Sequence, residues 1–118
     1  MSKNKWSPKN RIKSFGYAFK GLRVFASEPH LIIHCIAAIT VITAGIIVEL
    51  TPIKWAILSL TIALVIALEL MNTAMEKLID KLHPEQDPVI GKVKDVMAAA
   101  VLISAIGAIG VGVVVFFY

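Results

Sequence analysis

Residues 67–80, with the sequence ALELMNTAMEKLID, decide the fold of this chain because an apolar run acquires charges there without losing its helical pattern. The polar residues recur at steps of three, four and four, and are Glu69, Asn72, Glu76 and Asp80. One helix would place them on a single face over about 16 Å. An ionisable group at membrane depth costs about 2.5–3.5 kcal/mol and therefore indicates function. Two carboxylates beside an amide predict a magnesium and polyphosphate site.

The composition predicts a membrane protein. Of 118 residues, 58% are hydrophobic, and the mean hydropathy is +0.80. A soluble domain of this size cannot bury so much apolar surface. Three stretches are long enough to cross about 30 Å of hydrocarbon as helices, at about 30–48, 53–72 and 95–117. The sequence therefore predicts one integral-membrane, all-α domain over residues 1–118. We expect no cleavable signal peptide.

The segment before the first span predicts an amphipathic surface helix at about 8–27. Ser7 and Pro8 are a suitable N-cap and first-turn proline. The apolar residues that follow at helical spacing are Ile12, Phe15, Phe19, Leu22 and Ala26. Basic residues cover the neighbouring face, so we expect this helix to lie in the membrane interface.

The basic residues predict the orientation. Of 12 lysines and arginines, seven precede the first span and four lie between residues 77 and 95. The positive-inside rule then places the N-terminus and the loop 77–95 in the cytoplasm. The same rule, together with anionic lipid headgroups, accounts for the net charge of +4 without a nucleic-acid partner.

The loop between the second and third spans predicts a phosphate clamp. Prolines and charges at residues 81–90 indicate an irregular loop. Lys94 and Asp95 then lead into the last helix, whose N-terminal dipole favours anions. A solvated loop with charges that only mark topology is the alternative.

Small residues on the third span predict close helix packing. Ala100, Ser104, Ala108 and Gly112 recur every four residues. Such a face lets another helix approach, within the subunit or between subunits. Three short spans can hardly enclose both a nucleotide and a lipid, which favours a site assembled between subunits.

The chain resembles the small prokaryotic diacylglycerol kinases, a family that includes the undecaprenol kinases. The resemblance rests on the string of Glu69, Asn72, Glu76 and Asp80 with the downstream pair Lys94 and Asp95. Residues 13–22, KSFGYAFKGL, and Glu28 extend it upstream. It implies a homotrimeric helical bundle in the bacterial cytoplasmic (inner) membrane. It further implies transfer of the γ-phosphoryl group of ATP to a lipid alcohol with Mg²⁺.

The resemblance also implies roles for individual residues. Glu69 corresponds to the general base, and Glu28 and Glu76 correspond to the magnesium ligands. The implied nucleotide contacts are Tyr17, Glu28, Asn72, Glu76, Asp80, Glu85, Gln86, Asp87, Lys94 and Asp95. The implied contacts to the lipid substrate are Arg11, Arg23, Glu69 and Ala98.

Three functions stay open at this point. Conversion of diacylglycerol to phosphatidic acid is the first. Phosphorylation of undecaprenol is the second, because residues 28–34, EPHLIIH, resemble that branch more closely. The third is a non-catalytic transport or channel subunit, in which the polar stripe would line a pathway. A pathway needs polar groups through the full depth of the bilayer, whereas the charges here lie on one side. That distribution favours chemistry at the membrane surface.

Overall fold

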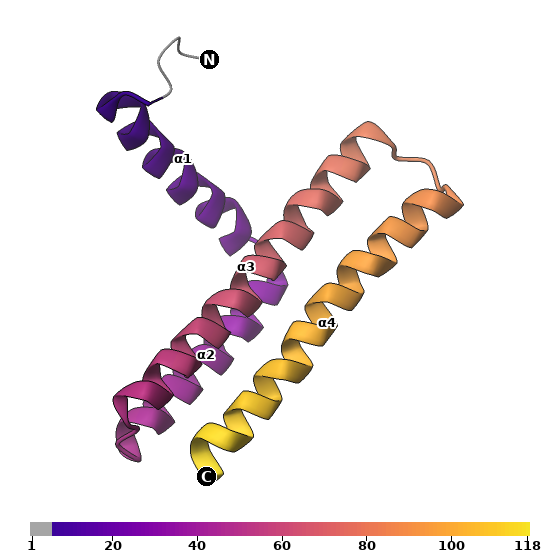
Figure 1. Ribbon diagram of the computed structural model, residues 1–118. Coiled ribbons are helices and arrows are strands. Elements are labelled where there is room, and N and C mark those ends of the chain that lie inside the picture. Colours follow the sequence, from indigo (N-terminus) through magenta and orange to yellow (C-terminus); the bar gives the residue numbers. More distant parts are fainter. Residues whose placement is uncertain (1–5) are drawn as a thin grey trace. The chain divides into compact units, whose positions relative to one another are not determined.

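The computed structural model describes residues 6–118, and this part of the chain forms four α-helices and no strand (Figure 1). They are α1 (Pro8–Ala26), α2 (Pro29–Ile47), α3 (Pro52–Leu82) and α4 (Pro88–Phe117). The all-α prediction is confirmed. The last three helices are each long and apolar enough to cross a membrane, which supports a multi-pass membrane protein.

Each helix begins at a proline, and the preceding residue caps three of them. Proline suits a first helical turn because that position has no intrahelical partner for an N–H group. Ser7 accepts a hydrogen bond from the Asn10 backbone N–H at 3.2 Å, and Thr51 accepts one from the Lys54 N–H at 3.4 Å. These local signals explain where the helices start.

The chain divides into two compact units, with the boundary after Ile36. The first unit contains α1 and the beginning of α2. Phe15 and Phe19 are exposed on α1, whereas Phe25 is buried. Exposed aromatic side chains are what an interfacial helix requires, and the predicted helix at about 8–27 is present with nearly the same bounds.

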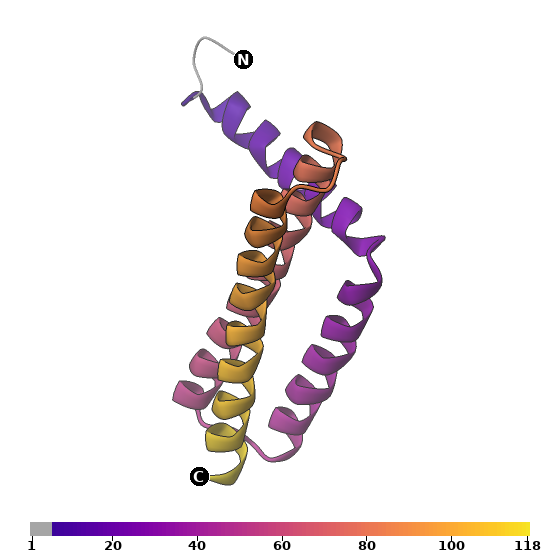
Figure 2. The ribbon, with the colours of Figure 1, turned by 90° about the vertical axis from the view of Figure 1, so that its right-hand side faces the viewer.

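The second unit is built on α3 and α4, which run antiparallel and lie side by side in both views (Figures 1 and 2). The predicted small-residue face of α4 is half-buried in this packing. The loop between the helices is shorter than predicted and spans residues 83–87. Helix α4 starts at Pro88 because Asp87 caps it, so the expectation of an irregular chain up to residue 90 is wrong.

The turn between α2 and α3 is tightly packed around Gly45. A Cβ atom added there would lie 2.8 Å from Cη2 of Trp55 and 2.9 Å from Cδ1 of Leu50. The Leu50 backbone N–H also donates to the Gly45 carbonyl at 3.1 Å. Glu49 within this turn has φ of 57°, the left-handed conformation that closes a helix end.

We predict that Gly45→Ala lowers the free energy of unfolding by about 1–3 kcal/mol, the usual cost of overpacking. The rigid Trp55 ring has to move to admit the methyl group. Titration with SDS, followed by circular dichroism, measures the change. Gly107→Ala is the matched control because a Cβ there meets nothing within 4 Å. Equal stability of Gly45→Ala and wild type would contradict the tight contact.

Candidate functional site

The predicted polar residues do share one helix, and their burial decreases along it. All four lie within α3. Glu69 is 7% exposed, Asn72 is half-buried, and Glu76 and Asp80 are exposed. We call these four residues the α3 polar stripe. It connects a buried carboxylate near the middle of α3 with a solvated end that faces the loop to α4.

Asn72 has an unsatisfied acceptor in the middle of this stripe. Its Oδ1 atom is buried and has no hydrogen-bond partner among the described residues. An unpaired buried polar group costs about 1–3 kcal/mol, so this oxygen is the atom of the stripe that most needs a donor or a cation. It is therefore a candidate contact for a bound group.

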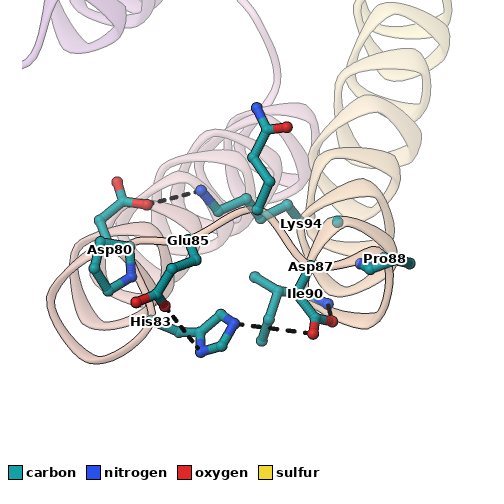
Figure 3. A pocket seen from close by; sticks show the side chains of 10 residues that line it. Asp80, His83, Glu85, Asp87, Pro88, Ile90 and Lys94 are labelled. Carbon is teal, nitrogen blue, oxygen red and sulfur yellow. Dashed lines mark hydrogen bonds and ion pairs between the residues drawn. The ribbon is translucent and has the colours of Figure 1, made fainter.

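A cavity of about 630 Å³ lies at the end of the stripe, between the tips of α3 and α4 (Figure 3). Its walls come from the last turn of α3, the connecting loop and the first two turns of α4. The lining residues are Asp80, His83, Pro84, Glu85, Gln86, Asp87, Pro88, Ile90, Gly91 and Lys94. Five of the predicted nucleotide contacts are thus brought together around one cavity.

An ion pair crosses this cavity from α3 to α4. Nζ of Lys94 donates to Oδ1 of Asp80 at 2.7 Å (Figure 3). The side chains are 39% and 66% exposed, respectively. Lys94 also interacts electrostatically with Glu76, one turn before Asp80 on α3. Among the described residues, Lys94 provides the only ammonium group of the cavity wall, and this group is held next to the acidic stripe.

His83 is a lining residue that the sequence interpretation missed. It caps the end of α3, where its backbone N–H donates to the Ile79 carbonyl at 2.7 Å. Its ring lies between two carboxylates, with Nδ1 3.7 Å from Glu85 and Nε2 3.9 Å from Asp87 (Figure 3). The two acids follow His83 at positions two and four in the sequence, but spacing within a loop does not indicate that the side chains meet.

Asp87 has a structural role at the start of α4. Its Oδ1 atom accepts hydrogen bonds from the N–H groups of Val89 and Ile90, at 2.8 and 3.2 Å. The carboxylate is thus the N-cap of α4. Asp95 and Ala98 lie further along α4, are exposed, and do not line the cavity.

The remaining predicted residues belong to the first unit. Arg11, Tyr17 and Arg23 are exposed on α1. The Arg11 guanidinium stacks over the Trp6 ring at 5.3 Å, and the Lys20 ammonium lies 5.6 Å from the centre of the Tyr17 ring. Glu28 lies between α1 and α2, where its backbone N–H donates to the Phe25 carbonyl at 2.9 Å.

The donors of the stripe fit Mg²⁺ in type. Magnesium prefers hard oxygen ligands, few of them from protein and the others from phosphate and water. Glu76 offers a carboxylate, and Asn72 offers its orphaned oxygen one turn away. Among residues 6–118, no three His, Cys, Asp or Glu side chains gather closely enough to hold a metal by themselves. The described chain thus offers part of a magnesium shell.

Comparison with known proteins identifies the family. The family model described as prokaryotic diacylglycerol kinase matches residues 16–116. A Synechocystis diacylglycerol kinase is 39% identical over 95% of this chain, which spans 66% of that protein. The undecaprenol kinase of Bacillus subtilis is 35% identical over 98% of this chain and 95% of its own length. The diacylglycerol kinase of Escherichia coli K12 is 30% identical over 83% of this chain and 81% of its own length. The chain therefore belongs to the prokaryotic diacylglycerol kinase family, a family of membrane lipid kinases.

Proposed function

We propose that this protein transfers the γ-phosphoryl group of ATP to the hydroxyl group of a membrane lipid, with diacylglycerol as the first candidate. The observation that supports this is the continuity of the α3 polar stripe. A buried carboxylate at one end and a solvated cavity that contains the Lys94 ammonium group at the other give a lipid hydroxyl and a triphosphate places along one face of the same helix. Phosphoryl transfer needs mainly such positioning and charge neutralisation.

Glu69 is the proposed general base. A helix needs about 20 residues to cross the hydrocarbon core of the membrane. Counted from Pro52, where α3 begins, this length ends close to Glu69, so we expect Glu69 near the boundary of the hydrocarbon core. A lipid hydroxyl arrives at that depth. A carboxylate there accepts the proton as the oxygen attacks phosphorus. Burial at 7% exposure keeps water from competing for the same position.

The nucleotide occupies the solvated side in this proposal. Lys94 neutralises phosphate oxygens, and the loop residues Glu85 and Gln86 line the place for the nucleoside. Glu76 and Glu28 hold Mg²⁺, which when bound withdraws charge from the phosphates. Asn72 contributes its unpaired Oδ1 acceptor one helical turn from Glu76. Tyr17, Asp95 and Asp87 are further proposed nucleotide contacts, and Arg11, Arg23 and Ala98 are proposed lipid contacts.

Undecaprenol is the second candidate substrate. One observation favours it: the match to the Bacillus subtilis undecaprenol kinase extends over 95% of that protein. The match to the Synechocystis diacylglycerol kinase has the higher identity, 39% against 35%. We therefore keep diacylglycerol first.

The test is a competition in mixed micelles. The purified protein receives labelled ATP, Mg²⁺, and diacylglycerol and undecaprenol at equal mole fraction. We expect labelled phosphatidic acid to form faster than undecaprenyl phosphate. Faster labelling of undecaprenol would reverse the order of the candidates. ATP hydrolysis with no labelled lipid would contradict lipid phosphorylation altogether.

We further propose that the protein works as a homotrimer in the bacterial cytoplasmic membrane, with its N-terminus in the cytoplasm. The excess of basic residues before α2 and near the α3–α4 loop supports the orientation. The orphaned Asn72 oxygen supports a site that a neighbouring subunit completes. The number three comes from the family resemblance.

Mixing inactive variants tests the shared site. If Glu28 and Glu69 of one site come from different chains, mixed oligomers of Glu28→Gln and Glu69→Gln subunits contain some wild-type sites. We expect partial recovery of lipid kinase activity after the subunits exchange. Crosslinking of differently tagged subunits verifies the exchange. Mixed oligomers that stay as inactive as either parent would show that both carboxylates belong to one chain.

A further inference from the structure

Asp80 and Lys94 form the closest charged contact in the cavity wall. The 2.7 Å bond joins the last turns of α3 to the second turn of α4 across the loop at residues 83–87. We propose that Asp80 does not contact the nucleotide but is a positioning residue, which holds Lys94 at the place where phosphate oxygens bind. This inference rests on the nucleotide role of Lys94 in the proposed function and replaces the role that the family resemblance implied for Asp80.

The chemistry of the lysine head permits both contacts at once. An ammonium group has three N–H donors and no acceptor. Asp80 takes one of them. Two donors therefore remain for phosphate oxygens without breaking the ion pair. The Lys94 side chain is 39% exposed, so these donors have access to the cavity.

Lys94 needs such a partner because of its own flexibility. A lysine head lies on a four-carbon stem with large rotamer freedom. Without a partner it would sample solvent and, at the membrane boundary, lipid headgroups. A carboxylate on the opposite helix fixes its direction toward α3. It also couples the position of Lys94 to the packing of α3 against α4.

Removal of Asp80 should change nucleotide affinity in a direction that distinguishes a positioning residue from a carboxylate that merely lies near the phosphates. The nucleotide is an anion, and Asp80 is a carboxylate in the wall of the same cavity. If Asp80 merely lay near the phosphates, its removal would relieve repulsion and tighten binding. A positioning residue gives the opposite result, because its removal releases the lysine. A magnesium ligand would also weaken binding on removal, but it would do so with or without Lys94.

A double-mutant cycle therefore tests the proposal. Binding of a non-hydrolysable ATP analogue with Mg²⁺ is measured by calorimetry for wild type, Asp80→Ala, Lys94→Met and the double variant. We expect Asp80→Ala to weaken binding about threefold, within the range for partly exposed ion pairs. Lys94→Met should weaken it about tenfold, as for a lost charged hydrogen bond. The double variant should equal Lys94→Met alone.

Kinetics and a conservative variant add independent readouts. Asp80→Ala should raise the KM for ATP by the same factor and leave kcat at saturating ATP unchanged. Asp80→Glu, which keeps the carboxylate, should recover most of the affinity. Asp80 is 66% exposed near the end of α3, so alanine, a strong helix former, suits the position. Asp80→Asn is a second charge-removing variant, for which we also expect weaker binding.

Three results would overturn the inference. The first is that Asp80→Ala binds the ATP analogue as tightly as wild type or more tightly. The second is that Asp80→Ala weakens binding by the same factor whether residue 94 is lysine or methionine. The third is that Asp80→Glu binds the analogue no better than Asp80→Ala. Each of them leaves the proposed function standing as long as Lys94→Met alone weakens binding. Wild-type affinity in Lys94→Met would instead contradict the nucleotide role of Lys94 itself and the inference with it.

Discussion

Glu69→Gln should reduce lipid phosphorylation by about 10²- to 10⁴-fold, the usual contribution of a positioned general base. Glutamine keeps the shape of the side chain and cannot accept the substrate proton. Because Glu69 is buried at 7% exposure, replacing a carboxylate by a neutral amide should not impair insertion or folding. The loss should therefore appear in kcat, and binding of the ATP analogue should stay close to that of wild type.

The same substitution at Glu49 is the control. Glu49 is an exposed carboxylate in the turn between α2 and α3, at the opposite end of α3 from the cavity. Glu49→Gln should leave turnover unchanged. If Glu69→Gln retains turnover within about threefold of wild type, the side chain is not the base, since proton transfer contributes far more than this. The buried carboxylate would then have a structural role.

Glu76→Gln should raise the magnesium concentration for half-maximal activity at least about tenfold, since even weaker perturbations of metal sites cost that much. The reason is the loss of a charged oxygen ligand beside the orphaned Asn72 oxygen. Glu28→Gln should shift the same curve in the same direction. Magnesium titrations of lipid phosphorylation, at saturating ATP and lipid, measure both shifts.

Nucleotide binding with and without Mg²⁺ tests more directly whether Glu76 is a magnesium ligand. If Glu76 holds the metal, Glu76→Gln should weaken binding of the ATP analogue in Mg²⁺ and leave its binding in EDTA unchanged. Glu49→Gln should match wild type under both conditions. Equal weakening with and without the metal would mean that Glu76 contacts the nucleotide directly. If the magnesium titration curve of Glu76→Gln superimposes on that of wild type, Glu76 is not a magnesium ligand.

Local patterns in the sequence account for the helices and for the polar stripe. The steps between Glu69, Asn72, Glu76 and Asp80 follow the helical period, and the structure confirms one helix through all of them. The start of α4 was also present in the sequence, since an Asp-Pro pair at residues 87 and 88 is a cap followed by a first-turn proline. The predicted loop was too long because charges and prolines were taken as signs of irregular chain.

The arrangement around the cavity had no such local signal. Lys94 and Asp80 are 14 positions apart on different helices, and neither residue's own pattern indicates the other. His83 was overlooked because its two carboxylate neighbours lie in a loop, where sequence spacing does not determine direction. Asp87 was assigned to the nucleotide, and the structure shows that one of its oxygens caps α4.

The sequence by itself determined the membrane class, the four helices, the acidic face of α3 and the family. These properties follow from hydropathy and from a period of about 3.6 residues, which every helix obeys regardless of its neighbours. Only the tertiary structure decided that Lys94 meets Asp80, that His83 lies between two acids and that the Asn72 oxygen stays unpaired. Such contacts depend on the rotation and height of α4 relative to α3, which arise from the packing of both apolar faces and are encoded in no single segment of the chain.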